Sequence, residues 1–129
     1  MFYRYASKTE TVKVSEFLSM TKRYPIYVLK YKGEEITLCE APVGSAAAAQ
    51  ILDWLIGYGV REIISAGTCG ALERFPESTF LVPNKALRDE GTSYHYAPAA
   101  DYIRMKNADT VAAFMKENGI PHVMGKTWT

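Results

Sequence analysis

The sequence predicts an α/β fold in which helices flank a mixed, largely parallel central sheet. Strand-like and helix-like segments alternate from Ile36 to Ala66, and the same order returns from Phe80 to Met124. Parallel strands need crossover connections of this kind, so the alternation favours strand–helix–strand units. The 129 residues are about the length of one domain, and we expect a single domain over 1–129.

The N-terminal third predicts a helix followed by a hairpin. Apolar residues recur at helical spacing in Val12–Lys22, which predicts a short amphipathic helix there. Two strand-like segments, Ile26–Leu29 and Ile36–Cys39, flank the turn signal Lys32-Gly33. We expect these two segments to pair as a hairpin.

The middle of the chain predicts a helix and then a buried strand. Ser45 suits a helix N-cap, four alanines follow it, and Ser45–Ile56 carries one apolar stripe. Val60–Ala66 has Ile63 and Ile64 at its centre and is typical of a buried strand. We expect one sheet, covered by this helix, to contain three strands: Ile36–Cys39, Glu62–Ala66 and Phe80–Val82.

The C-terminal third predicts a loop between a strand and a helix. Arg88–Pro98 is polar and aromatic without a clean period, so we expect a loop after the strand at Phe80–Val82. A helix is expected to begin near Asn107 and to end at Gly119. Pro121–Met124 then predicts a last strand.

Composition excludes some classes of partner. Fifteen Lys and Arg residues against fourteen Asp and Glu residues give a net charge of +1, so neither nucleic acid nor a membrane is expected as the main partner. No apolar run approaches the ~20 residues of a membrane helix, the N-terminus lacks an apolar signal region, and we expect a cytoplasmic protein. Cys39 and Cys69 lack metal-ligand spacing, so we expect buried free thiols and no metal site.

Two turns could meet an anion. Val43-Gly44-Ser45 opens the predicted helix, where free N–H groups and the helix dipole favour negative charge. Gly67-Thr68-Cys69-Gly70 follows the expected central strand, at the edge where open α/β sheets bind ligands. Glycine after a strand is also typical of a plain turn, and that alternative stays open from the residues alone.

Three blocks, taken together, resemble the purine nucleoside and uridine phosphorylase superfamily, nearest its uridine phosphorylase branch. Val60–Ala71 resembles the central strand and turn of that family. Gly44-Ser45, with the helix behind it, resembles the preceding family segment, and Arg88–Tyr96 resembles a loop of the uridine phosphorylases. The blocks come in family order, and the resemblance implies a nucleoside phosphorylase-like fold of which this chain is the N-terminal portion.

The resemblance also implies roles for individual residues. It places phosphate on Ser65, Ala66, Gly67 and Thr68. It places the nucleoside on Val43, Gly44, Thr68, Cys69 and Gly70, with His95 as a further candidate. The implied reaction is phosphorolysis of the N-glycosidic bond of uridine or a purine nucleoside, giving a free base and a sugar 1-phosphate. Inorganic phosphate would be the co-substrate, no other cofactor is implied, and a homo-oligomer is expected.

Departures from the family pattern keep other hypotheses open. Ser65 stands where phosphorylases commonly have an arginine, which suggests a hydrolytic relative as an alternative. The early phosphate loop has no match in Met1–Thr11, and the residues that hold the ribose and assist the departing base would lie beyond Thr129. No catalytic residue is therefore assigned, and we expect a domain truncated at both ends. An inactive chain that only binds or assembles is a further alternative.

Two further side-chain hypotheses concern nucleophiles and acids. Cys69 could be a nucleophile, although no histidine is near it in the sequence, and a small core thiol is the alternative. Asp89 and Glu90 could form a pair of acids, or they could belong to a solvated loop paired with Arg88. An unrelated flavodoxin-like domain would need a cofactor loop after the first strand, and none is evident.

Overall fold

The computed structural model describes residues 11–128, which divide into two compact units. Within that range, unit 1 comprises 11–43 and 47–63, and unit 2 comprises 44–46 and 64–128. The single domain predicted over 1–129 stays a prediction. The predicted lack of a phosphate loop in Met1–Thr11 lies almost wholly outside the described residues.

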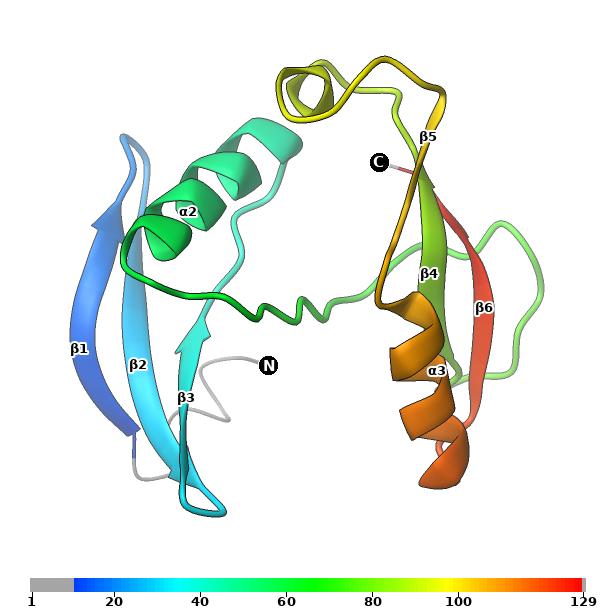
Figure 1. Cartoon of the computed structure of the whole chain (residues 1–129), viewed down its shortest axis with the longest axis horizontal. Helices are drawn as coiled ribbons and strands as arrows, with labels where there is room; N and C mark the ends of the chain where they lie inside the picture. Colours follow the sequence, from blue (N-terminus) through cyan, green and yellow to red (C-terminus); the bar gives the residue numbers. More distant parts are fainter. Residues whose placement is uncertain (1–10, 129) are drawn as a thin grey trace. The chain divides into compact units, whose positions relative to one another are not determined.

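Unit 1 is built on a three-stranded antiparallel sheet in the order β1-β2-β3 (Figure 1). Its strands are β1 (Thr11–Leu18), β2 (Arg23–Tyr31) and β3 (Glu34–Cys39). Strands β2 and β3 form the predicted hairpin, with Leu29 opposite Ile36. Lys32 and Gly33 both have positive φ in the turn, a conformation that glycine adopts easily.

The helix predicted over Val12–Lys22 is wrong, because this segment contains β1. Thr11 to Leu18 pairs antiparallel with β2, and the register shifts between Lys13 and Ser15. A bulge interrupts the alternation of side chains along a strand. The irregular apolar spacing that imitates a helix therefore belongs to a bulged strand.

The predicted helix is confirmed as α2 (Ser45–Gly57). Ile51 and Leu55, from its apolar stripe, are buried with Tyr24 of β2. Aromatic rings extend this core: the ring centroids of Phe17 and Trp54 lie 5.7 Å apart, in an edge-to-face arrangement. The core of unit 1 thus joins the helix to the sheet through large apolar side chains.

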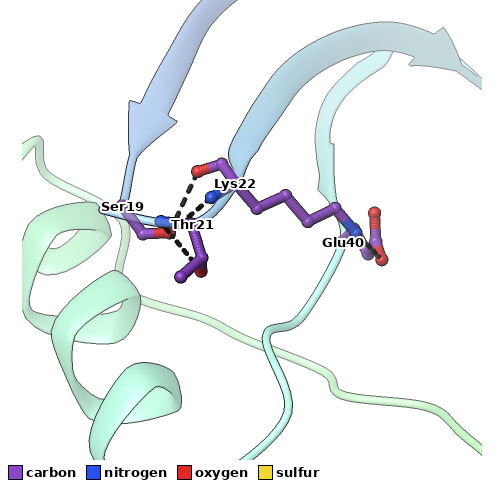
Figure 2. Close-up of polar contacts among 4 residues, drawn as sticks. All are labelled: Ser19, Thr21, Lys22 and Glu40. Carbon is purple, nitrogen blue, oxygen red and sulfur yellow. Dashed lines mark hydrogen bonds and ion pairs between the residues drawn. The ribbon is translucent and has the colours of Figure 1, made fainter.

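A serine fixes the connection between β1 and β2 (Figure 2). The Ser19 hydroxyl oxygen accepts hydrogen bonds from the backbone N–H of Lys22 at 3.0 Å and of Thr21 at 3.3 Å. The same hydroxyl lies 3.0 Å from the Lys22 carbonyl, to which it can donate. The Lys22 ammonium group pairs with Glu40, just after β3. This exposed ion pair adds little stability, so Ser19 is the main polar determinant of the turn.

Replacing Ser19 with alanine is expected to lower the free energy of unfolding of unit 1 by about 1 kcal/mol, because the turn loses its side-chain hydrogen bonds. Trp54 fluorescence during urea unfolding, in a Trp128→Phe background, measures this value. Lys22→Gln, which removes the exposed ion pair with Glu40 and the cation–π contact with Tyr24 but leaves the Ser19 hydroxyl in place, is the matched control and is expected to have a smaller effect. Equal effects of the two variants would contradict the assignment.

Unit 2 contains a mixed three-stranded sheet in the order β5-β4-β6. Its elements are β4 (Phe80–Leu87), the 3₁₀ turn η1 (Thr92–His95), β5 (Tyr102–Arg104), α3 (Ala108–Glu117) and β6 (His122–Thr127). Strand β4 pairs parallel with β6 and antiparallel with β5. Helix α3 contacts both β4 and β6, so β4, α3 and β6 form the predicted strand–helix–strand unit.

The strand predicted over Val60–Ala66 is absent from the described structure. The segment has no regular secondary structure, and Ile63 and Ile64 are 45% and 89% exposed. An apolar run of this kind becomes a strand only when neighbours pair with it and cover both faces, and no described strand pairs with it. Consequently β3 and β4 belong to separate sheets, and the single sheet predicted for them is also wrong.

The mixed α/β class itself is confirmed by the two sheets and by helices α2 and α3 of the described residues. The parallel share is smaller than predicted: among the described strands, β4–β6 is the one parallel ladder and three ladders are antiparallel. The missing strand explains this difference, because it was the expected parallel neighbour in the centre. None of the helices in the described range is long and apolar enough to cross a membrane.

Candidate functional site

The predicted phosphate turn lies on the surface of unit 2. Residues 65–70 are all exposed and lie in a stretch without regular secondary structure, ahead of β4. The hydroxyls of Ser65 and Thr68 make no hydrogen bond with any described residue. The turn therefore offers free hydroxyl groups to a ligand, and its role as a phosphate site stays a prediction.

Cys69 is exposed, so the prediction that it is a buried thiol is wrong. The surrounding turn exposes every side chain, because the strand expected to precede it does not form. Cys39 is half-buried at the end of β3, and burial raises the pKa of its thiol. Within residues 11–128, no group of three His, Cys, Asp or Glu side chains is arranged to hold a metal ion.

The second predicted turn, at Gly44-Ser45, is in hydrogen-bond contact with the loop after β4. Gly44 has φ of +94°, and Ser45 is the first residue of α2. The Ser45 hydroxyl lies 3.1 Å from the Thr92 hydroxyl, which places residues 47 positions apart in hydrogen-bond contact within unit 2. Two of the three blocks that carry the family resemblance therefore meet here.

Glu90 organises this contact from the loop side. Its carboxylate accepts hydrogen bonds from the backbone N–H of Thr92 at 2.8 Å and of Ser93 at 3.1 Å. Hydrogen bonds from the Ser93 and Ser45 side chains and from these two amides lower the pKa of Glu90 to about 2. The ionised carboxylate thus holds the start of η1 and Ser45 together.

Arg88 is buried beneath the same loop and donates hydrogen bonds to it. It is the one charged residue among the described residues that is buried, at 6% exposure. Its guanidinium donates to the Ser93 hydroxyl at 3.0 Å, to the Ala97 carbonyl at 3.1 Å and to the Pro98 carbonyl. The guanidinium carbon also lies 4.2 Å from the ring centroid of Tyr94.

These contacts correct the predicted pairing of this loop. Arg88 forms no ion pair with Asp89 or Glu90, because its donors are taken by neutral acceptors and Glu90 faces backbone amides. Asp89 instead accepts a hydrogen bond from the Trp128 indole at 3.2 Å. Asp89 and Glu90 therefore contact different groups and do not act as a pair of acids.

The remaining predicted nucleoside-binding residues are exposed. His95, the last residue of η1, makes no hydrogen bond with residues 11–128 through its ring. Val43 is 98% exposed and belongs to unit 1. The Ser45 hydroxyl, next to the predicted Gly44, is in hydrogen-bond contact with the Thr92 hydroxyl. The hydroxyls of Ser65 and Thr68 make no hydrogen bond with either of these two residues.

Replacing Glu90 with glutamine is expected to remove an acid-sensitive part of the stability of unit 2. The folded-state pKa of about 2 lies below the usual value, so the carboxylate stabilises the fold above about pH 4.5. That contribution is lost as pH falls towards 2. Urea midpoints measured through Trp128, in a Trp54→Phe background, should fall more steeply from pH 5 to 2.5 in the chain that retains Glu90 than in the Glu90→Gln variant.

The control for this experiment is Glu77→Gln, at an exposed glutamate that makes no ion pair with any described residue. Its midpoints should run parallel to those of the wild type. If Glu90→Gln also runs parallel to the wild type, the carboxylate does not hold the loop.

Comparison with known proteins relates this architecture to one family. The family model described as "Phosphorylase superfamily" matches residues 3–129. Guanosine phosphorylase of Halorubrum lacusprofundi is 34% identical over 83 residues, which cover 64% of this chain and 34% of that protein. Uridine phosphorylase of Haemophilus influenzae is 27% identical over 116 residues, which cover 87% of this chain and 46% of that protein.

The fold is shared with a solved structure. Purine nucleoside phosphorylase from Toxoplasma gondii, solved with immucillin-H, superposes with a TM-score of 0.80 at 20% sequence identity. The superposition covers 99% of this chain and 52% of that one. The chain thus spans about half or less of the length of the proteins it matches.

Proposed function

We propose, because the chain belongs to the phosphorylase superfamily, that it acts in phosphorolysis of the N-glycosidic bond of a nucleoside. The products would be a free base and a sugar 1-phosphate. Inorganic phosphate would serve as co-substrate without any further cofactor. Uridine and a purine nucleoside are both candidate substrates, because the relatives include a uridine and a guanosine phosphorylase.

The family match over residues 3–129 carries this proposal, and the exposed turn supports it. Phosphorolysis requires phosphate beside the sugar carbon that loses the base, where positive charge develops. We place phosphate at Ser65–Thr68, whose backbone N–H groups and free hydroxyls can donate to it. We place the nucleoside at Val43, Gly44, Cys69, Gly70 and His95, with Thr68 between the two ligands.

Hydrolysis is the second candidate, and Ser65 is the observation that favours it. Phosphate binding gains most from a planar guanidinium, which offers two parallel charge-assisted hydrogen bonds. A serine hydroxyl supplies no positive charge, so water can compete more easily for the position beside the sugar. We also propose that copies of the chain associate, and the exposed Val12 and Val14 on the edge strand β1 support this.

An assay of base release by the purified chain tests the reaction. Uridine and guanosine are each incubated with and without phosphate, and the free base and sugar 1-phosphate are quantified. Release that requires phosphate supports phosphorolysis, whereas release of base and free ribose without phosphate supports hydrolysis. Nucleoside binding without release, measured by calorimetry, would contradict catalysis by this chain alone.

A further inference from the structure

Three positive side chains stand in one row across the sheet of unit 2. Arg104 of β5 lies opposite Lys85 of β4, and Lys85 lies opposite Lys126 of β6. Residues directly opposite on neighbouring strands share a face of the sheet. Because adjacent strands are about 4.8 Å apart, this basic row of Arg104, Lys85 and Lys126 spans about 10 Å.

A tyrosine ring holds the two lysines of the basic row. The Nζ atoms of Lys85 and Lys126 lie 5.0 Å and 5.6 Å from the ring centroid of Tyr102. Both distances are within the range of a cation–π contact. The ring restrains the two ammonium groups without neutralising them, and it is itself 41% exposed.

No carboxylate of residues 11–128 pairs with the basic row. Arg104, Lys85 and Lys126 make no ion pair with any residue in the described part of the chain. The segment between β4 and β5 contains three acids, Asp89, Glu90 and Asp101. The Asp89 carboxylate accepts from the Trp128 indole, and the Glu90 carboxylate accepts from the backbone N–H groups of Thr92 and Ser93. Like charges directly opposite one another destabilise a sheet, so a bound anion would relieve the repulsion.

We propose that the basic row is a binding site for an oligophosphate group. A single phosphate can reach two neighbouring members of the row, whereas a chain of two or three phosphates can contact all three. Lysine and arginine both form charge-assisted hydrogen bonds with phosphate oxygens. The basic row shares no residue with the turn at Ser65–Thr68, and the proposal does not depend on the proposed function.

The oligophosphate has two possible sources, a free inorganic chain or a nucleoside triphosphate. Calorimetry on the whole chain at low salt therefore uses tripolyphosphate in one arm and uridine or guanosine triphosphate in the other. Saturable binding is expected in both arms, weakening as salt increases. Equal affinities would identify the phosphate chain as the recognised group, and tighter nucleotide binding would identify the nucleotide as the source.

Substitutions locate the site. Lys85→Gln, at the centre of the basic row, is expected to weaken tripolyphosphate binding about tenfold or more, and Arg104→Gln and Lys126→Gln severalfold each. Tyr102→Leu keeps the charges but frees the lysines, so an intermediate loss is expected. Lys116→Gln, which removes one positive charge from α3, is the control and should bind like the wild type.

Three results would overturn the proposal. The first is the lack of saturable binding. The second is an unchanged affinity in Lys85→Gln while circular dichroism shows the wild-type fold. The third is a loss of tripolyphosphate binding in Thr68→Val but not in Lys85→Gln, which would place the anion at the turn. Binding that survives Thr68→Val and fails in Lys85→Gln supports the basic row, whatever the base-release assay shows.

Discussion

Replacing Arg88 with methionine is expected to lower the free energy of unfolding of unit 2 by about 3 kcal/mol. Methionine fills a similar volume but donates no hydrogen bond. The Ser93 hydroxyl and the carbonyls of Ala97 and Pro98 would lose their donor, and the Tyr94 ring would lose its cation. Arg88→Lys keeps the positive charge but lacks the planar guanidinium with its several N–H donors, so a smaller loss of stability is expected.

Each unit carries one tryptophan, which allows the two to be followed separately. Trp128 reports on unit 2 when Trp54 of unit 1 is replaced by phenylalanine. In urea, the Trp128 transition of Arg88→Met should shift, whereas the Trp54 transition in a Trp128→Phe background should not. Arg74→Met, at an exposed arginine, should change stability by less than about 0.5 kcal/mol. A similar loss in both variants would show that Arg88 is not a support of the loop.

Local signals predicted most of the elements. The turn at Lys32-Gly33, the stripe of α2 and the ends of α3 all arise from residues close together in sequence. Where pairing with another segment decides the conformation, the local pattern failed. β1 became a bulged strand against β2, and Val60–Ala66 formed no strand because no described segment pairs with it.

In the candidate site, too, local contacts can be predicted from the sequence and contacts between distant segments cannot. The Glu90 contacts with Thr92 and Ser93 are local. An acid two or three residues before free N–H groups is a sequence signal for such contacts, although the polar pattern of Arg88–Pro98 predicts only a loop. The contact between Ser45 and Thr92 spans 47 positions and depends on how the chain folds back. The buried state of Arg88 could not be read either, since its acceptors are carbonyls and a hydroxyl rather than a carboxylate.

Introducing an arginine at Ser65 is expected to tighten phosphate binding by about 10- to 100-fold, which corresponds to about 1.5–3 kcal/mol. Ser65 is exposed and its hydroxyl has no partner among the described residues, so a longer side chain displaces no contact described there. A guanidinium would add a bidentate pair of charge-assisted hydrogen bonds to phosphate held at the turn. Ser65→Lys adds the positive charge without a bidentate guanidinium, so a smaller gain in phosphate affinity is expected.

Calorimetric titration with inorganic phosphate, at fixed ionic strength, measures the effect. Gln50→Arg adds the same charge at an exposed position of α2 and controls for general attraction of anions. The proposed site requires a gain in Ser65→Arg that Gln50→Arg does not share. If both variants bind phosphate like the wild type, phosphate does not sit at this turn. If Ser65→Arg binds more tightly and base release becomes more dependent on phosphate, the serine is what favours water over phosphate in the natural chain.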